Sequence, residues 1–469
     1  MLACLPALLL AQPQRVLLPV NSSAAQPSRF EDDDDEPPPS SLSIWANSST
    51  WPTEAEQCTS NGCYPRIFII GAQKAATSSL FQSLQYHGTA CGAVFPENSP
   101  SFSPDLPSSE KEAHVFDVQG QSWADLMKEP SLFTRIYQPQ DCPTRHFVDA
   151  TPRYSRFPAA PAHMALLLPS HWLPQLRILM LIRDPIARDL SWFNHKIDLV
   201  TGRKQEMQGN NVFCAAPNSQ GIPTYHAEVE CRKQELDNCM SQAREHLAKV
   251  NVAFNPDHNA TVDPARNEEY PADATRLAEY VYDACAGDYR VWKDCLGKTG
   301  SDLVDCLDKT GSDLDQYVTA LYVTEAPLLA WGMYLPQIRS FVRRARVARN
   351  QLLVLPFERL LRTPNEELRS VTEFMGLPPL RNNTLMEVGT HDSAYRVEVI
   401  SCETRSTLDG VYAEWNAMLY RGLTDDRRMG LTPLQEKHFG GFPQIPCVDK
   451  ERAVGPNGTR LTAQGTVYL

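Results

Sequence analysis

The stretch from Arg66 to Leu80, which reads RIFIIGAQKAATSSL, constrains the fold of this chain more than any other segment. Its apolar, mostly β-branched run Ile67–Ile70 predicts a buried strand. Gly71 follows where the chain must turn, and the hydroxyl-rich segment Thr77–Leu84 predicts a helix. Backbone N–H groups at a helix start attract anions, and Lys74 in the turn adds a positive charge. The stretch therefore predicts a phosphate-binding turn; the alternative is an ordinary turn with a surface lysine.

This turn differs from the Walker A loop of kinases and ATPases. The GxxxxGK[ST] pattern is absent, and Lys74 precedes the hydroxyl residues with no glycine before it. The turn therefore argues against a nucleotide kinase or another P-loop NTPase.

Three further apolar runs predict strands, at His146–Val148, Leu176–Ile182 and Gln351–Leu355. Helical patterns lie between them, including Ser191–Leu199 and Ala326–Val347. Buried strands that alternate with helices predict an α/β fold in which a mainly parallel sheet is covered by helices on both faces.

The first 57 residues have a different composition from the rest. Met1–Ala11 is apolar but too short to span a bilayer, and we interpret residues 1–20 as a signal segment or a truncated anchor. Residues 21–57 contain the acidic run Glu31–Glu36 followed by three prolines, which predicts a disordered linker. No later stretch approaches about 18 uncharged apolar residues, so we expect no further membrane span.

The folded domain is predicted at residues 58–449, followed by a tail at 450–469. Between residues 201 and 316 the periodic pattern weakens, which predicts a surface insertion. It contains an 11-residue tandem repeat, Cys295–Asp305 followed by Cys306–Gln316. Two copies are too few for a solenoid.

Cysteines, sequons and charge limit the compartment and the partners. The chain has 13 cysteines, and no two of them form the CxxC pair typical of a zinc ribbon or a redox motif. Asn-x-Ser/Thr sequons occur at five positions, Asn21, Asn47, Asn259, Asn382 and Asn457. Together with the apolar start they predict a secretory protein with disulfides. The net charge of −12 argues against a nucleic-acid partner.

The segment Leu181–Phe193, LIRDPIARDLSWF, is the second candidate anion site. Arg183 follows a buried strand, where open α/β sheets bind ligands. Pro185 suits a helix start, which places Ser191 about two turns into that helix. The Arg183 guanidinium and the Ser191 hydroxyl can donate hydrogen bonds to one phosphate from two sides. The alternative is a salt bridge from Arg183 to Asp184 or Asp189.

The two segments together resemble the sulfotransferases that use 3′-phosphoadenosine 5′-phosphosulfate (PAPS), through strand-G-x-x-K-x-x-T-S and strand-R-D-P-x-x-R-x-x-S. The resemblance implies a P-loop-like three-layer α/β fold. It places Arg183 and Ser191 at the 3′-phosphate of PAPS. It places six residues around the 5′-phosphosulfate: Lys74, Ala75, Ala76, Thr77, Ser78 and Ser79. This chain has Ala75-Ala76 where the family usually has a glycine before the threonine.

A third segment, KEAHVFD at Lys111–Asp117, resembles the K-E-x-H-F-F segment of Golgi heparan sulfate sulfotransferases, N- and O-directed. The resemblance implies that Glu112 is the base on the acceptor, assisted by Lys74. His114 is the rival base. The alternative is that Glu112 only pairs with Lys111 on a loop.

A fourth segment, DATPRY, matches the D-x-[ST]-P-x-Y segment of the same subfamily, which lines the acceptor cleft. It makes Asp149 and Arg153 acceptor-binding candidates beside Lys111; the alternative is a capped turn before Pro152. The basic segment Arg339–Arg349 predicts a helix that faces either an anionic polymer or solvent. The segment Glu403-Thr404-Arg405 replaces a lysine- and glycine-rich loop that is usual in the family, and Arg405 is a further nucleotide-binding candidate.

The sequence thus predicts a PAPS-dependent sulfotransferase of the Golgi lumen that needs no metal and acts on a hydroxyl or amine, with a carbohydrate as the expected acceptor. Two alternatives stay open. One is a P-loop nucleotide kinase or NTPase, and the other is an inactive secreted binding module of the same fold.

Overall fold

The computed structural model divides the chain into two units, Met1–Ser43 and Ile44–Leu469. All described residues belong to the second unit, and they are 58–59, 62–95, 110–117, 125–142, 144, 146–202, 213–217, 222–251, 282, 285, 328–345, 347–380, 385, 396–424, 441–442, 445–449 and 452–454. The predicted signal segment, the linker, the five sequons and the tandem repeat lie outside them. The predicted domain boundaries therefore stay predictions.

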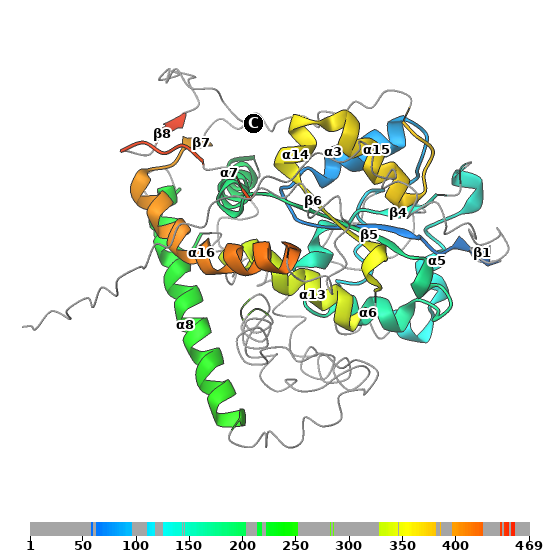
Figure 1. The fold of residues 1–469 in the computed structure, drawn as a ribbon, viewed down its shortest axis with the longest axis horizontal. Helices are drawn as coiled ribbons and strands as arrows, with labels where there is room; N and C mark the ends of the chain where they lie inside the picture. Colours follow the sequence, from blue (N-terminus) through cyan, green and yellow to red (C-terminus); the bar gives the residue numbers. More distant parts are fainter. Residues whose placement is uncertain are drawn as a thin grey trace, which may run out of the picture. The chain divides into compact units, whose positions relative to one another are not determined.

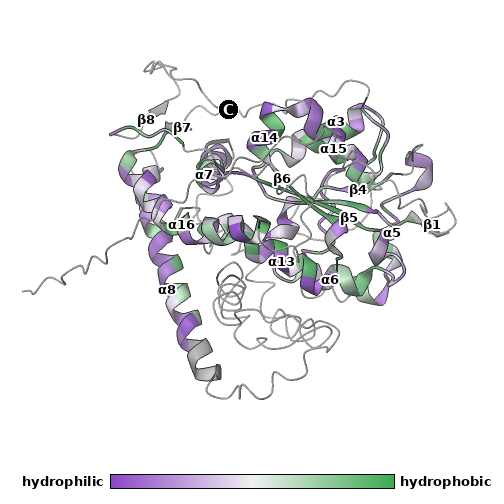
Figure 2. Ribbon diagram, in the orientation of Figure 1, coloured by the Kyte–Doolittle hydropathy of each residue, from purple (hydrophilic) through white to green (hydrophobic). Residues whose placement is uncertain are grey.

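Four parallel strands form the central sheet, in the order β4-β3-β5-β6 (Figure 1). Their bounds are β3 Ile67–Gly71, β4 Val148–Asp149, β5 Arg177–Ile182 and β6 Leu352–Pro356. Each strand coincides with a run that the sequence analysis singled out, and all are almost entirely buried. Figure 2 shows the hydrophobic colour along these strands, as expected for a sheet covered on both faces.

Helices α3, α14 and α15 lie on one face of the sheet, and α6 and α13 lie on the other (Figure 1). This confirms the predicted three-layer α/β fold. The α-helices are α3 Thr77–Tyr86, α5 Ser131–Thr134, α6 Ala160–Leu167, α7 Pro185–Gly202, α8 Tyr225–Asn251, α13 Tyr334–Arg344, α14 Phe357–Arg362, α15 Pro364–Met375 and α16 Cys402–Thr424. The short 3-10 turns are η1 Pro139–Asp141, η2 Pro152–Ser155, η3 Leu173–Gln175, η5 Leu328–Gly332 and η6 Arg349–Gln351. Two small antiparallel pairs complete the described elements, β1 Cys58–Thr59 with β2 Gly62–Cys63 and β7 Arg396–Val399 with β8 Arg452–Val454.

The carboxyl ends of β3 and β5 meet at one edge of the sheet because the two strands are adjacent and parallel. A turn and a helix follow each strand, α3 after β3 and α7 after β5. Turn η2 packs against the end of β3, since a Cβ on Gly71 would lie 2.2 Å from Ser155 Oγ and 3.2 Å from the Pro152 carbonyl oxygen. Gly71 therefore lets a third segment reach the same edge.

A second hydrophobic cluster joins α7, α8, α16 and η5 beside the sheet. Helix α8 belongs to the region predicted as an insertion, and its weak amphipathic pattern did not indicate a helix. It contributes Tyr225 and Val229 to the cluster and the fully buried Glu228 and Arg232 to an ion network. Arg232 Nη1 lies 3.4 Å from Asp189 Oδ1, so this network ties α8 to α7.

Two predicted helices have different bounds in the structure. The pattern at Ala326–Val347 is interrupted at Met333, because Pro336 lies in the first turn of α13, which begins at Tyr334, and a proline there cannot continue a helix from the preceding residues. The basic segment Arg339–Arg349 leaves the helix after Arg344, and Arg339 is only 7% exposed. The prediction of one continuous basic helix is therefore wrong, and so is the prediction that Arg339 faces solvent.

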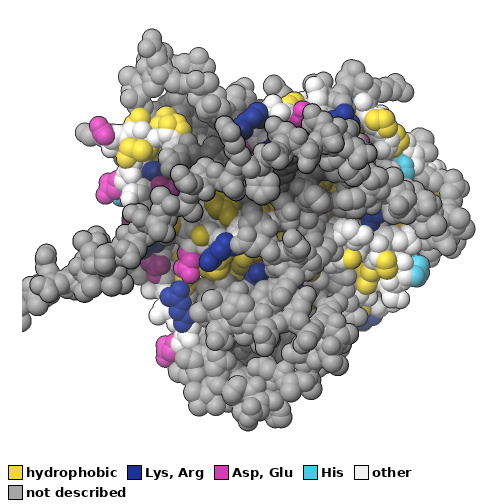
Figure 3. Space-filling view, in the orientation of Figure 1, with side chains coloured by type: hydrophobic (Ala, Val, Ile, Leu, Met, Phe, Trp, Pro, Cys, Tyr) yellow, Lys and Arg dark blue, Asp and Glu magenta, His cyan; other side chains and the backbone are white. Residues whose placement is uncertain are grey.

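Acidic and basic side chains lie close together on the face that Figure 3 shows. Elsewhere in the described part of the chain, opposite charges are paired on helix surfaces, as in Lys233 with Asp237 at 2.6 Å and Arg405 with Asp409 at 3.0 Å. The described residues on this face thus form no broad surface of one charge.

All ten cysteines in the described part of the chain form disulfides. The pairs are Cys58–Cys63, Cys91–Cys142, Cys214–Cys231, Cys239–Cys285 and Cys402–Cys447. Such a set is typical of proteins that mature in an oxidising compartment. Within the described ranges, no helix combines the length and the apolar character that a membrane span requires.

Candidate active site

The turn between β3 and α3 presents unused hydrogen-bond donors. The backbone N–H groups of Thr77, Ser78 and Ser79 have no acceptor among the described residues, as expected in the first turn of a helix. Ala76 precedes the helix and provides no side-chain cap. The predicted phosphate-binding turn therefore has the donors that an anion needs.

Three non-glycine residues in the described part of the chain have a positive φ angle, namely Lys74 at 68°, Ala76 at 63° and His114 at 54°. Such conformations cost on the order of 1–3 kcal/mol each and concentrate at functional sites. All three residues were predicted as site residues from the sequence. Ala75 differs, because its side chain is fully buried and its N–H donates to the Ala72 carbonyl oxygen at 3.1 Å. The N–H that we expected Ala75 to offer a ligand is thus used inside the turn.

Arg183 lies directly against the turn. Its Nη1 donates to the Lys74 carbonyl oxygen at 3.0 Å, and its guanidinium carbon lies 4.7 Å from the centre of the Phe357 ring. Arg183 Nε is buried and has no hydrogen-bond partner among the described residues. The guanidinium therefore keeps a donor that a bound anion would satisfy.

The alternative role of Arg183, a salt bridge to Asp184 or Asp189, does not occur within the described structure. Asp184 Oδ1 accepts a hydrogen bond from the Ala187 N–H at 2.8 Å at the start of α7. Asp189 faces α8 and accepts a hydrogen bond from the Tyr225 hydroxyl at 2.8 Å. Ser191 is partly buried on α7, and its hydroxyl makes no hydrogen bond to a described residue.

The Lys74 ammonium is coupled to four charged side chains of the site. Burial lowers its pKa to about 8; the Asp198 and Glu112 carboxylates oppose this shift, and the Arg183 and Lys111 cations add to it. These groups come from separate segments of the chain. Three of the four segments singled out in the sequence therefore lie within electrostatic range of one another.

Glu112 heads a chain of charged groups. Its Oε1 contacts the Lys111 ammonium, and its Oε2 lies 3.3 Å from His114 Nε2. His114 Nδ1 lies 2.8 Å from Asp117 Oδ2, and Arg153 Nε lies 3.7 Å from the same oxygen. The pairing of Glu112 with Lys111, which was the structural alternative for this segment, is therefore present together with the His114 contact.

The pKa values of these charged groups distinguish the two candidate bases, Glu112 and His114. Burial would raise the pKa of Glu112, but the hydrogen bond from His114 and the Lys111 charge outweigh it and lower that pKa. Burial would lower the pKa of His114, but the Asp117 and Glu112 carboxylates raise it to about 9. At neutral pH Glu112 is therefore ionised and able to accept a proton, whereas His114 is protonated and serves as a donor.

Asp149, an acceptor-binding candidate of the sequence analysis, has its carboxylate engaged inside the protein. It is 1% exposed, and its two carboxylate oxygens accept hydrogen bonds from Thr151 Oγ1 at 2.6 Å and the Tyr154 hydroxyl at 2.8 Å. The Tyr154 hydroxyl also accepts the Val115 N–H at 2.9 Å. Asp149 therefore attaches the DATPRY segment to the KEAHVFD segment.

Arg405 lies in the first turn of α16. Its Nε donates to Asp409 Oδ2 at 3.0 Å, and its Nη1 contacts the Ile445 carbonyl oxygen. Burial raises the pKa of Asp184 to about 6, and the Arg405 charge opposes that rise. Arg405 is thus within electrostatic range of the end of β5, but these contacts engage its guanidinium.

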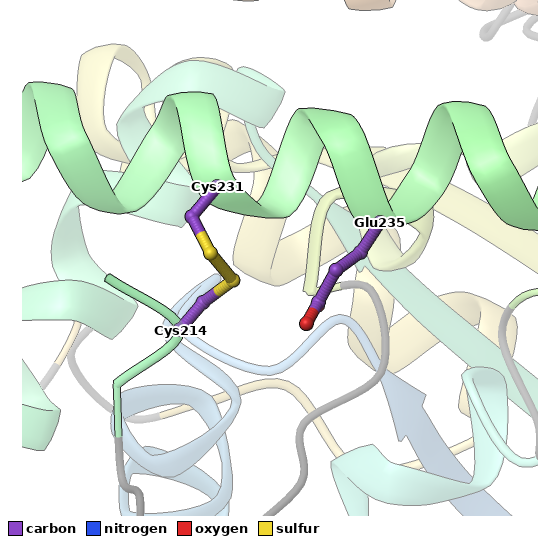
Figure 4. Close-up of side chains that lie close together, drawn as sticks. All are labelled: Cys214, Cys231 and Glu235. Atoms are coloured by element: carbon purple, nitrogen blue, oxygen red, sulfur yellow. A yellow bond between two sulfur atoms is a disulfide. The ribbon is translucent and has the colours of Figure 1, made fainter. Parts of the chain in front are cut away.

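One group of potential metal ligands exists among the described residues, and Figure 4 shows its three side chains, Cys214, Cys231 and Glu235. The two cysteine sulfurs are joined in a disulfide and cannot act as thiolate ligands. This group therefore suits a covalent link to α8 rather than a metal centre.

The sequence analysis missed an aromatic group beside Lys74. Lys74 Nζ lies 6.0 Å from the centre of the Trp192 ring, and the Arg156 guanidinium carbon lies 5.8 Å from it. Trp192 belongs to the segment Leu181–Phe193, and Arg156 lies two residues after the DATPRY segment. Only the packing of α7 against the turn η2 brings the two side chains together. Tryptophan directly after Ser191 was the one signal that pointed to them.

No protein-family model matches the chain. Among solved structures, the chain is similar to a sulfotransferase from Alicyclobacillus acidocaldarius, with 17% sequence identity and a TM-score of 0.34, over 80% of this chain and 100% of that chain. A likeness at that level carries no functional argument, so the proposal below rests on the contacts of the site.

Proposed function

We propose that this protein is a sulfotransferase that moves the sulfuryl group of PAPS to an acceptor hydroxyl or amine. The observation that carries the proposal is the direct contact between the two candidate anion-binding segments. Arg183 donates to the Lys74 carbonyl oxygen at 3.0 Å, although 109 residues separate the two along the chain. Two cationic segments at one sheet edge suit a nucleotide with phosphate groups at both of its ends.

The residues of the turn fit the 5′-phosphosulfate end of that nucleotide. Thr77, Ser78 and Ser79 supply N–H groups without an acceptor in the described structure, and Lys74 supplies a charge. Arg183 and Ser191 fit the 3′-phosphate, because a buried Nε and a hydroxyl have no described partner there. Bound PAPS would supply the activated sulfuryl group.

The mechanism that these residues support is an in-line displacement at sulfur. Glu112 accepts the proton of the acceptor while a bond forms between the acceptor atom and sulfur. The bond between sulfur and the bridging phosphate oxygen breaks, and Lys74 stabilises the charge that develops on this oxygen. Adenosine 3′,5′-bisphosphate is the leaving group. Positioning and electrostatics supply most of the rate enhancement in such transfers.

We further propose a carbohydrate acceptor and a Golgi location. The support for the acceptor is the resemblance of KEAHVFD and DATPRY to segments of polysaccharide-modifying sulfotransferases. These two segments are joined in the structure through Asp149, Tyr154 and the Val115 N–H. The disulfides agree with a secretory compartment.

The decisive test is titration calorimetry with adenosine 3′,5′-bisphosphate, followed by transfer of labelled sulfate from PAPS. We expect Lys74→Ala and Arg183→Ala each to weaken binding by about tenfold to a hundredfold, since each removes a charge-assisted contact, and to abolish detectable transfer. Arg135→Gln, which changes an exposed arginine elsewhere, is the matched control. Full activity in both alanine variants, or binding of ATP without binding of the bisphosphate, would contradict the proposal.

A further inference from the structure

One peptide group beside the proposed 3′-phosphate site is held at both of its ends by side chains. It is the peptide group between Arg183 and Asp184. The Tyr334 hydroxyl donates to the Arg183 carbonyl oxygen at 2.7 Å, and the Asp184 N–H donates to Glu358 Oε1 at 2.8 Å. We call these two hydrogen bonds the Arg183 clamp.

The clamp follows from the way in which the central sheet ends. The last register pair between β5 and β6 is Ile182 with Pro356, so the next peptide group after β5 lies beyond the ladder. Glu358 follows Pro356 by two residues at the start of α14, and Tyr334 is the first residue of α13. A buried peptide group needs partners for both of its polar atoms. Two helices supply them here in place of a neighbouring strand.

The same region also holds the Arg183 side chain. Its guanidinium carbon lies 4.7 Å from the centre of the Phe357 ring, and its Nη1 donates to the Lys74 carbonyl oxygen at 3.0 Å. The Glu358 carboxylate attracts the guanidinium, because each of the two groups shifts the pKa of the other toward its charged form. The backbone and the side chain of Arg183 are therefore both fixed by the surrounding protein.

Burial strengthens the clamp. Tyr334 is 1% exposed and Asp184 is 7% exposed, so water competes little for either hydrogen bond. Burial also raises the pKa of Tyr334, which keeps its hydroxyl a donor at neutral pH. Removing either partner would leave a buried backbone group unpaired, and the peptide group would then be free to turn toward another partner.

We propose that Tyr334 and Glu358 are positioning residues that aim Arg183 at the 3′-phosphate, and that they thereby set the preference of the site for a 3′-phosphorylated nucleotide. This inference rests on the proposed function. The two residues act through the peptide group, since its rotation would change the direction of the Arg183 side chain. A contact between a guanidinium and a phosphate depends on orientation, so a loss of aim weakens it.

The test measures two affinities by titration calorimetry, for adenosine 3′,5′-bisphosphate and for adenosine 5′-monophosphate, which lacks the 3′-phosphate. Tyr334→Phe keeps the ring and removes the hydroxyl. It should weaken binding of the bisphosphate by about threefold to tenfold and leave binding of the monophosphate unchanged. Tyr64→Phe is the matched control, because Tyr64 precedes β3 and so lies at the opposite edge of the parallel sheet.

Two variants of Glu358 separate geometry from charge. Glu358→Gln keeps an oxygen that can accept the Asp184 N–H and removes a negative charge beside Arg183, so it should bind the bisphosphate at least as tightly as the wild type. Glu358→Ala removes the charge and the acceptor together, and it should bind about threefold to tenfold more weakly than Glu358→Gln. Equal affinities of the two variants would overturn the role of Glu358.

A double-mutant cycle shows whether Tyr334 acts through Arg183. In an Arg183→Ala background, Tyr334→Phe should cause no further loss of affinity for the bisphosphate, because no guanidinium is left to aim. The inference fails if the two losses add, if Tyr334→Phe weakens both nucleotides equally, or if it weakens neither. A wild type that binds neither nucleotide would instead overturn the proposed function, and this inference with it.

Discussion

The two halves of the candidate active site are built in opposite ways. On the nucleotide side, the N–H groups of the α3 start and Arg183 Nε have no partner among the described residues. On the acceptor side, Glu112, His114, Asp117 and Arg153 contact one another in an unbroken chain. The first half has donors without a described partner, whereas in the second half positive and negative groups face one another.

This difference has a physical reason. A nucleotide with several negative charges can supply every acceptor that the turn lacks, so the turn needs no internal partner. A carboxylate base must stay ionised and correctly oriented before an uncharged hydroxyl arrives, so it needs permanent cationic neighbours. Strained backbone occurs on both sides, at Lys74 and Ala76 on one and at His114 on the other.

The largest expected effect separates the chemistry of the two halves. We expect Glu112→Gln to lower kcat by about 10²–10⁴-fold, because a positioned base contributes a factor of that size. Its affinity for adenosine 3′,5′-bisphosphate should stay unchanged, since the nucleotide half is intact. Glu110→Gln, two residues away and exposed, is the matched control. Equal losses of affinity and kcat in Glu112→Gln would show that the halves are not separate.

The second prediction concerns stability and the acceptor half alone. His114 has a pKa of about 9 in the folded protein and an ordinary value of 6.5 when unfolded. The stabilising effect is therefore complete below pH 6.5 and is lost as the pH rises through 9, at a cost on the order of 3 kcal/mol. Urea unfolding with intact disulfides at pH 6.5 and pH 9 measures it. His114→Gln should flatten the dependence, whereas the exposed His171→Gln should not; a slope that survives in His114→Gln would contradict the assignment.

The third prediction concerns the nucleotide half alone. The Lys74 pKa of about 8 means that its charge is lost as the pH rises above 8. The dissociation constant of the bisphosphate should therefore increase by about tenfold between pH 7 and pH 9. Calorimetry on Lys74→Arg should show no such increase, because arginine stays charged. His114→Gln should retain the increase in the dissociation constant. If this variant lost the increase, the titrating group would lie in the acceptor half, and the prediction would be wrong.

The smallest effect tests backbone strain in the turn. Ala76 has a φ angle of 63°, which glycine adopts without the steric cost that alanine meets. Ala76→Gly should therefore raise the free energy of unfolding by roughly 0.5–1 kcal/mol after the entropy cost of glycine is subtracted. Ala75→Gly is the matched neighbour and should instead be destabilising, since the Ala75 side chain is fully buried. Urea unfolding of both variants gives the comparison; two changes of the same sign would exclude local strain at Ala76.

Local sequence patterns were sufficient to predict the strands of the sheet and the nucleotide half of the candidate site. The β-branched runs at Ile67–Ile70 and Leu176–Ile182 predict buried strands because a strand covered on both faces must be apolar throughout. The glycine turn with Lys74 and the Arg183 position follow from the same strands. Helix α8 was not indicated because its buried face carries charges, Glu228 and Arg232, which satisfy one another only after folding.

The roles of individual polar residues were harder to predict. Asp149 is part of a motif that suggested an acceptor-binding acid, yet its two carboxylate oxygens accept hydrogen bonds from Thr151 and Tyr154. The packing of Arg156 against Trp192 and Trp331 was not predicted, because the three residues are remote in sequence. Such contacts depend on which side chains face one another across different elements, and no local period encodes that.

The sequence by itself thus determined the four strands, their alternation with helices and the residues at the strand ends, because hydrophobic periodicity and turn chemistry are local properties. Only the tertiary structure decided that Arg183 reaches the Lys74 carbonyl, that His114 holds a proton beside Glu112, and that Arg156 stacks on Trp331. These arrangements form only when segments that are distant in sequence meet. Their burial then sets the pKa of the ionisable groups and leaves some donors without a partner in the described structure.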